Sequence, residues 1–178
     1  NSVYKNKNIL ETMKKEFSEK NILKLESLFP LEEYKKIKNK IEKLHFKNKK
    51  IPDKFSYEEA DIEEDSLDSE LKQLISDLTS SKIKQLTLKK FKHGNYTLIH
   101  DSETKQETKF FFFLSDEWDP DHGGNFVFTK NDEETFYVTP TPNALLLIKK
   151  TSDLKEFIQY INHLANEKEF LFVEGILG

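Results

Sequence analysis

Cysteine and arginine are both absent from this sequence. Without cysteine the chain has no disulfide, no thiolate metal ligand and no cysteine nucleophile. All 28 of its basic residues are lysines, so no guanidinium is available to hold a carboxylate through two parallel hydrogen bonds. An anion site in this chain would therefore depend on lysine, backbone amides or neutral polar groups.

Long apolar runs are missing as well. The run Phe110–Leu114 is far too short to span a membrane, and the N-terminal stretch "NSVYKNKNIL" has no apolar signal region. A net charge of -4 argues against broad nucleic-acid binding, which needs a basic face. With 34% charged and 12% aromatic residues in 178, we expect one globular domain over residues 1–178, and a cytoplasmic location.

Residues 1–80 show mainly helical spacing. A helix is predicted to begin at Pro30, followed by two glutamates, and to continue to Leu44. A further helix is predicted over residues 66–78, with Ser66 or Asp68 as its N-cap. The acidic stretch between these helices, residues 48–66, is predicted to be an irregular surface loop. The apolar spacing that indicates helix before Pro30 is carried by Ile9, Met13, Phe17, Ile22, Leu25 and Leu28.

After Ser80 the apolar spacing changes to that of strands. Short runs rich in β-branched and aromatic residues are separated by Gly, Pro, Asn and Asp turns, which is typical of a β-sandwich or small barrel. The run Phe110–Phe113 is predicted to be a strand buried on both faces. The sequence therefore predicts an α+β fold, with about eight strands and the N-terminal helices packed on one sheet.

Five segments of this β half carry a family resemblance. They are "GNYTLIHD", "FFFFLSDEWDPDHGGNFVF", "VTPTPNALLLI", "LKEFIQYI" and "EFLFVEGIL". Together they resemble the double-stranded β-helix, a jelly-roll or cupin-like sandwich, of the 2-oxoglutarate/iron(II) oxygenases, in particular their prolyl-hydroxylase branch. The resemblance implies Fe(II) and 2-oxoglutarate as cofactors and a protein or peptide as the substrate or partner. The Trp118 turn that restarts through Gly-Gly is its most specific part.

The same resemblance implies a site in which several positions have changed. The family binds iron through His-x-Asp and a distant histidine. His100 matches the first histidine, but Ser102 stands where the aspartate is expected and the carboxylate is at Asp101. Lys155 stands at the place of the distant histidine. His100 and Asp101 are therefore the candidate metal ligands of a degenerate metal motif.

The cofactor contacts implied by the resemblance have also changed. The residue that anchors the far carboxylate of 2-oxoglutarate falls near Lys168–Phe170, which makes Lys168 the candidate anchor. The tyrosine expected on the strand before the Trp-Asp turn is replaced by Phe112 or Phe113. Tyr96 is a second candidate cofactor contact.

Strand geometry weakens this ligand set. Adjacent residues of a strand point to opposite faces, so His100 and Asp101 converge only if the chain turns at Asp101. The ammonium of Lys155 has no lone pair to give a metal, although it could stand in the metal's place and pair with Asp101. The remaining histidines are predicted to be ordinary: His45 and His93 on the surface and His122 in a solvated turn, with His163 an alternative ligand only if the chain folds back.

Three functions remain open from the sequence. The first is a weakly active or inactive relative of the prolyl hydroxylases that binds a polypeptide or small ligand in its barrel. The second is an active Fe(II)/2-oxoglutarate-dependent prolyl hydroxylase with an altered ligand set. The third is a structural interaction module without pocket chemistry.

Overall fold

The computed structural model describes residue 4 and residues 6–98, 106–130 and 133–178. Its helices are α1 (Lys7–Lys20), α2 (Leu31–Ile41) and α3 (Ser69–Thr79), with single 3₁₀ turns at Glu64–Ser66 (η2), Pro120–His122 (η3) and His163–Ala165 (η4). Its strands are β1 (Ile22–Leu25), β2 (Lys47–Ile51), β3 (Phe55–Asp61), β4 (Ile83–Lys92), β5 (Tyr96–Thr97), β6 (Glu107–Phe113), β7 (Phe126–Lys130), β8 (Glu133–Val138), β9 (Ala144–Lys150), β10 (Leu154–Ile158) and β11 (Glu169–Leu177). None of the helices in these residues is long and apolar enough to cross a membrane.

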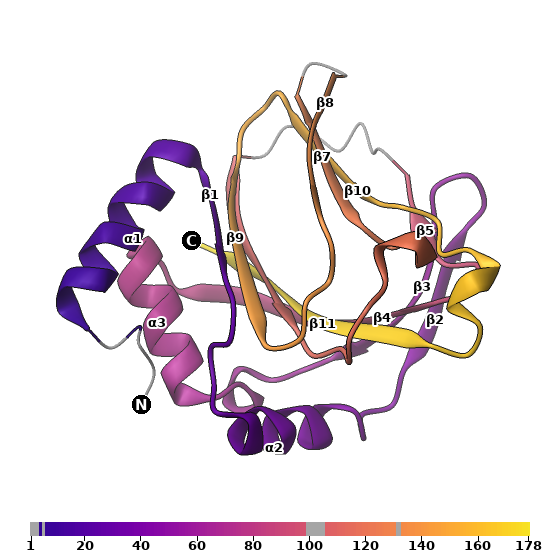
Figure 1. Cartoon of the computed structure of the whole chain (residues 1–178), viewed down its shortest axis with the longest axis horizontal. Coiled ribbons are helices and arrows are strands. Elements are labelled where there is room, and N and C mark those ends of the chain that lie inside the picture. Colours follow the sequence, from indigo (N-terminus) through magenta and orange to yellow (C-terminus); the bar gives the residue numbers. More distant parts are fainter. Residues whose placement is uncertain (1–3, 5, 99–105, 131–132) are drawn as a thin grey trace.

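The strands form two antiparallel sheets that face each other (Figure 1). Within the described residues, the larger sheet has the order β1-β9-β6-β11-β4-β3-β2, with β5 paired to β3, and the smaller has the order β10-β7-β8. The three helices lie along the outer side of the larger sheet (Figure 1). The predicted α+β fold, a double-stranded β-helix with helices packed on one sheet, is confirmed.

Two apolar cores follow from this layering. The outer core lies between the helices and the larger sheet and includes Ile75, Phe110 and Phe112. The inner core lies between the sheets and includes Phe111 and Phe113. Alternation along β6 sends successive phenylalanines to opposite faces, so the prediction of a strand buried on both faces is confirmed.

Both helices after Pro30 are present as predicted, although α2 ends at Ile41 and not at Leu44. α2 begins at Leu31 with Glu32 and Glu33 in its first turn, where carboxylates stabilise the positive end of the helix dipole. α3 begins after Asp68, whose side chain accepts hydrogen bonds from the backbone of Glu70 and Leu71. Asp68, rather than Ser66, is therefore the N-cap.

Two predictions for residues 1–80 were wrong, because this part is not purely helical. Asn21 takes a left-handed conformation (φ 59°) and ends α1, after which β1 pairs with β9. Residues 48–66 are not an irregular loop, since β2 and β3 form a hairpin around Asp53 (φ 60°) and β3 adds to β4. β3 was not predicted because its sequence is polar and acidic. In the structure these charges are paired across the sheet, as Glu58 is with Lys90 of β4 at 2.7 Å.

The Trp118 turn has a structural role, as predicted. The indole Nε1 of Trp118 donates a 2.9 Å hydrogen bond to the carbonyl of Gly123, and its ring packs on Phe170 with centroids 4.8 Å apart. Gly123 has φ +76°, and a Cβ there would lie 2.2 Å from the carbonyl oxygen of Tyr160. Only glycine fits this position. The same turn buries His122 against Trp118, so the prediction of a solvated histidine was wrong.

Candidate functional site: a charged cavity inside the barrel

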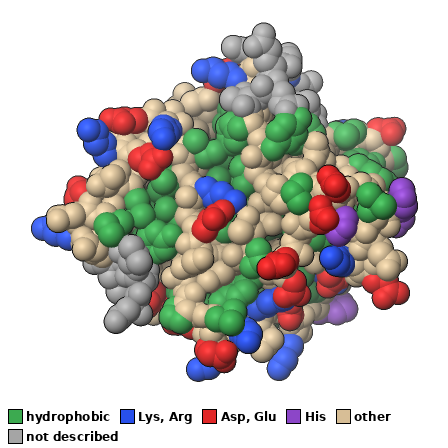
Figure 2. Space-filling model, in the orientation of Figure 1, with side chains coloured by type: hydrophobic (Ala, Val, Ile, Leu, Met, Phe, Trp, Pro, Cys, Tyr) green, Lys and Arg blue, Asp and Glu red, His purple; other side chains and the backbone are tan. Residues whose placement is uncertain are grey.

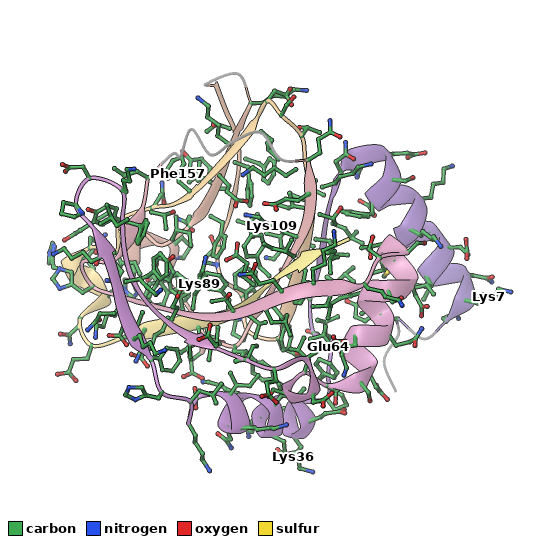
Figure 3. The ribbon with its side chains drawn as sticks, turned by 180° about the vertical axis from the view of Figure 1, so that it is seen from behind. Lys7, Lys36, Glu64, Lys89, Lys109 and Phe157 are labelled. Carbon is green, nitrogen blue, oxygen red and sulfur yellow. The ribbon has the colours of Figure 1, made fainter. Side chains whose placement is uncertain are left out.

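A cavity of about 410 Å³ lies between the two sheets. Figure 3 shows Lys89 and Lys109 reaching into it from the larger sheet, with Phe157 on the opposite side. Its apolar wall is aromatic and includes Phe55, Tyr57, Phe111, Phe126, Phe157 and Phe172. Its charged wall consists of Lys89, Lys109, Lys150, Glu107, Glu156 and Glu174.

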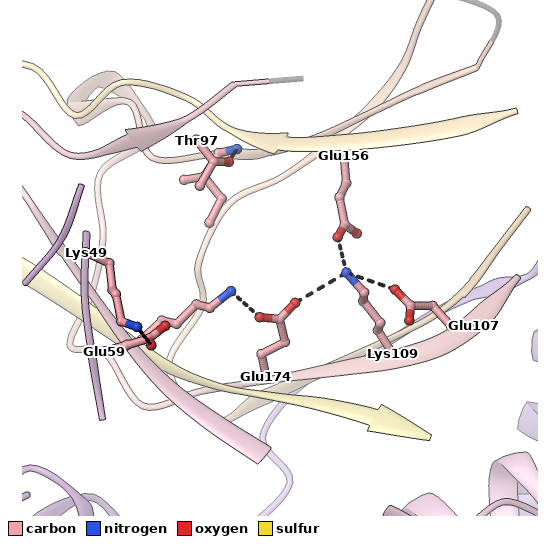
Figure 4. Close-up of polar contacts among 9 residues, drawn as sticks. Lys49, Glu59, Thr97, Glu107, Lys109, Glu156 and Glu174 are labelled. Carbon is pink, nitrogen blue, oxygen red and sulfur yellow. Dashed lines mark hydrogen bonds and ion pairs between the residues drawn. The ribbon is translucent and has the colours of Figure 1, made fainter. Parts of the chain in front are cut away.

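Four of these charges form a chain of ion pairs across the barrel (Figure 4). On the larger sheet, Lys89 of β4 pairs with Glu174 of β11, which lies 3.4 Å from Nζ of Lys109 on β6. Lys109 then donates a hydrogen bond to Glu156 of β10 on the smaller sheet. The ion pairs therefore connect the two sheets along the charged wall of the cavity.

Lys109 is the centre of this arrangement. Its ammonium contacts Glu156, lies 3.4 Å from Glu107 and lies 3.4 Å from Glu174, while its side chain is only 10% exposed. An ammonium has three protons to donate and no lone pair. Three carboxylates therefore surround one cation, and that cation is a side chain.

The same contacts shift the pKa values of the buried groups. Burial alone would raise the pKa of Glu174, but the charges of Lys89 and Lys109 outweigh it and lower that pKa to about 2. Burial alone would lower the pKa of Lys109, but Glu156, Glu174 and Glu107 raise it above its ordinary value. For Lys89 the carboxylate of Glu174 likewise outweighs burial and raises the pKa. All three groups are charged at neutral pH.

Lys89 also contacts the aromatic wall. Its Nζ lies 5.1 Å from the ring centroid of Tyr57, within the range of a cation–π interaction. Tyr57 in turn stacks on Phe91 at 5.3 Å. The Lys89 end of the ion-pair chain is thus packed against aromatic rings, and such partly buried ion pairs are costly to break.

The sequence-predicted site residues that lie within the described part of the chain do not line this cavity. His100, Asp101 and Ser102 lie outside the described residues, so their roles stay predictions. Lys155 pairs with Thr129 in the ladder, next to Glu156. Because neighbours in a strand point to opposite faces, Glu156 rather than Lys155 faces the cavity, and Lys155 does not line it.

The two candidate cofactor contacts also lie elsewhere. Lys168 is exposed in the turn before β11 and does not line the cavity. Tyr96 faces a separate shallow hollow that it shares with Tyr160, at 6.3 Å between ring centroids. Their predicted roles therefore have no support from their positions. His45, His93 and His163 are exposed.

Sequence reasoning missed the charged cavity itself. One signal was present, because Glu174 is a single carboxylate inside the apolar strand β11. A charge at such a position needs a buried partner. The partners could not be named, since Lys89, Lys109 and Glu156 come from three other strands whose register is not evident from the sequence.

The fold and the sequence agree on a family. The model of the family described as "Oxoglutarate and iron-dependent oxygenase degradation C-term" matches residues 61–175, which include β4 to β10 and most of β11. This chain belongs to that family. Membership confirms the resemblance to the prolyl-hydroxylase-like 2-oxoglutarate oxygenases.

Two relatives of this family member are prolyl 3-hydroxylases. The chain is 34% identical over 90 residues to mouse prolyl 3-hydroxylase OGFOD1, and the aligned segment covers 48% of this chain and 16% of the mouse protein. It is 27% identical over 88 residues to prolyl 3-hydroxylase OGFOD1 of Xenopus laevis, covering 46% of this chain and 17% of that protein. The match thus spans less than a fifth of either relative.

Solved structures show the same fold over nearly the whole chain. A Trichoplax adhaerens prolyl hydroxylase in complex with a hypoxia inducible factor peptide superposes with a TM-score of 0.76 at 13% identity, covering 98% of this chain and 91% of that one. A Pseudomonas putida prolyl-4-hydroxylase gives 0.73 at 10% identity, covering 95% and 98%. At such low identity the likeness concerns the fold alone.

The described residues of this family member do not fit iron and 2-oxoglutarate. 2-Oxoglutarate is a dicarboxylate, and Lys89 and Lys109 in the cavity are already paired with glutamates. In the part of the chain that the structure describes, no group of three His, Cys, Asp or Glu side chains is arranged to hold a metal ion. Lys89, Lys109, Glu156 and Glu174 instead neutralise one another.

Proposed function

We propose that this chain is a prolyl-hydroxylase-like domain that binds a polypeptide in its barrel and does not oxidise it. The observation that carries the proposal is the ion-pair chain from Lys89 through Glu174 and Lys109 to Glu156, in which these charged groups of the cavity lining are already paired with one another. An anionic cofactor would have to break these pairs in a buried setting, at a cost of several kcal/mol.

The aromatic wall supports the choice of a polypeptide. Phe55, Tyr57, Phe111 and Phe157 line the cavity beside the ion pairs, and aromatic-lined grooves bind extended proline-containing peptides. The relatives point the same way, since one is a prolyl 3-hydroxylase and one solved neighbour holds a peptide. The activity of those proteins is not carried over to this chain.

Two measurements on the purified chain test the two parts of this proposal. With iron(II), ascorbate and 2-oxoglutarate, we expect no succinate above that of the heat-denatured chain, and turnover of 2-oxoglutarate would contradict the absence of catalysis. With an acetylated octaproline peptide, we expect NMR shifts at the cavity-lining amides of Thr97 and Ile158. If the chemical shifts of these amides stay unchanged at the highest soluble peptide concentration, polypeptide binding in the cavity is contradicted.

A further inference from the structure

The two edges of the larger sheet differ in how they are protected. At one edge, all five residues of β2 are exposed and three of them are lysines. Charged edge strands of this kind prevent pairing with other chains. At the other edge, β1 buries Leu23 and Leu25, carries the single Lys24, and has neither proline nor a bulge. The β1 edge therefore lacks the protection that β2 has.

The backbone of β1 offers open hydrogen-bonding groups. Lys149 N–H donates to the carbonyl of Asn21 at 2.8 Å, and β1 and β9 then pair in antiparallel register. Because bonded and non-bonded pairs alternate in such a ladder, the N–H and C=O groups of Ile22 and Lys24 point away from β9. No residue in the described part of the chain supplies them with a backbone or side-chain partner.

A groove of about 650 Å³ runs along this edge between α1 and β1. Figure 2 shows apolar side chains gathered on this side of the molecule, between the places of α1 and β1 in Figure 1. Its apolar lining is Tyr4, Met13, Ile22, Leu23 and Leu25. The groove is thus an apolar surface alongside a row of open backbone groups.

The charges of the groove are paired among themselves. Lys20 lies 2.7 Å from Glu16, and Lys24 lies 2.7 Å from Glu26. Neither sign is left in excess for a charged partner. A side chain that enters the groove is therefore best matched if it is uncharged.

We propose that β1 is a docking edge for an extended peptide whose alternate side chains are apolar and uncharged. The open groups of Ile22 and Lys24 fix the occupant as a strand, and the groove takes the side chains on one of its faces. A second copy of the chain is a poorer occupant, because a four-residue strand is only about 13 Å long. Pairing along so short a strand buries much less than the roughly 1,600 Å² of a standard protein–protein interface. The proposal is independent of the cavity function.

The test uses fluorescein-labelled acetyl-Lys-Thr-Val-Thr-Val-Thr-Val-Thr-Lys-amide and fluorescence anisotropy with the whole chain. Lys24→Pro removes the outward N–H, and proline is tolerated on an edge strand at such a position. Lys24→Ala is the matched control, because it removes the same side chain but keeps the N–H. We expect Lys24→Pro to weaken binding at least about tenfold, from lost hydrogen bonds and steric blocking, and Lys24→Ala to bind like the unchanged chain.

A second probe keeps the proposal testable if Lys24→Pro does not fold. The same peptide with alternate backbone amides N-methylated, added to the unchanged chain, is expected to lose binding. Equal binding of the methylated peptide, or equal binding by Lys24→Pro and Lys24→Ala, would overturn the proposal. So would a dimer in analytical ultracentrifugation that Lys24→Pro dissociates, since β1 would then pair with a second copy.

Discussion

Lys109 provides the positive charge that compensates the carboxylates inside the barrel. One buried ammonium contacts Glu107, Glu156 and Glu174, so its removal leaves three carboxylates with less compensation. Breaking a buried ion pair from one side is far more costly than replacing both partners.

We expect Lys109→Met to lower the free energy of unfolding by about 3–5 kcal/mol. Lys130→Met is the matched control, because Lys130 is 59% exposed and lies 3.4 Å from Asp153 on the surface. That change is expected to cost at most about 1 kcal/mol. Urea denaturation of both variants measures the difference, and equal losses would contradict the role given to Lys109.

Glu174 gives the interior a pH dependence. Its pKa is lowered from 4.5 to about 2 by Lys89 and Lys109, against the effect of burial. A carboxyl group with a lowered pKa in the folded state stabilises the fold above its unfolded value, and this stability is lost as pH falls from about 4.5 to about 2. The shift corresponds to about 3 kcal/mol.

We therefore expect Glu174→Gln to be less stable at pH 7 and to lose less stability than the unchanged chain between pH 5 and pH 2. Denaturant unfolding at several pH values measures this. Parallel curves for the two proteins would show that Glu174 does not titrate as described.

At the scale of elements, β11 lies in the middle of the larger sheet. It pairs with β4 on one side and β6 on the other, and Gly175 lies opposite Phe110. A Cβ at Gly175 would lie 1.9 Å from Cε1 of Phe110. The ring of Phe110 therefore covers the glycine and takes the space that a side chain would need.

Gly175→Ala is expected to destabilise the chain by about 1–3 kcal/mol through this overlap. Because the strain comes from one ring, Gly175→Ala combined with Phe110→Leu should cost less than the sum of the two single changes. Thermal unfolding of the three variants measures the coupling. Additive losses would place the strain elsewhere.

The elements also show what the sequence could predict. α2, α3 and the strands after Ser80 follow from local spacing and capping, as with Asp68 before α3. β2 and β3 escaped prediction because their polar residues are satisfied by pairing, as Glu58 is by Lys90. At the site, the sequence did not show which side chain of β10 lines the cavity, which in the structure is Glu156 and not Lys155. The role of Lys155 as the replaced metal ligand stays a prediction.

The whole molecule is an oxygenase fold in which charged side chains of the interior pair with one another. The family, the two facing sheets and the helices outside them agree with prolyl-hydroxylase relatives. The ion-pair chain joins the larger sheet to the smaller one, a connection that comes from the chain's own residues (Figure 4).

Within the described residues, the ion pairs leave Lys89 and Lys109 without a free charge for the carboxylates of 2-oxoglutarate. Anaerobic calorimetric titration of 2-oxoglutarate into the chain with manganese(II) tests it most directly. The account predicts heats equal to those of dilution up to about 1 mM 2-oxoglutarate, which corresponds to binding weaker than about -4 kcal/mol. Saturable one-to-one binding in the micromolar range would contradict it.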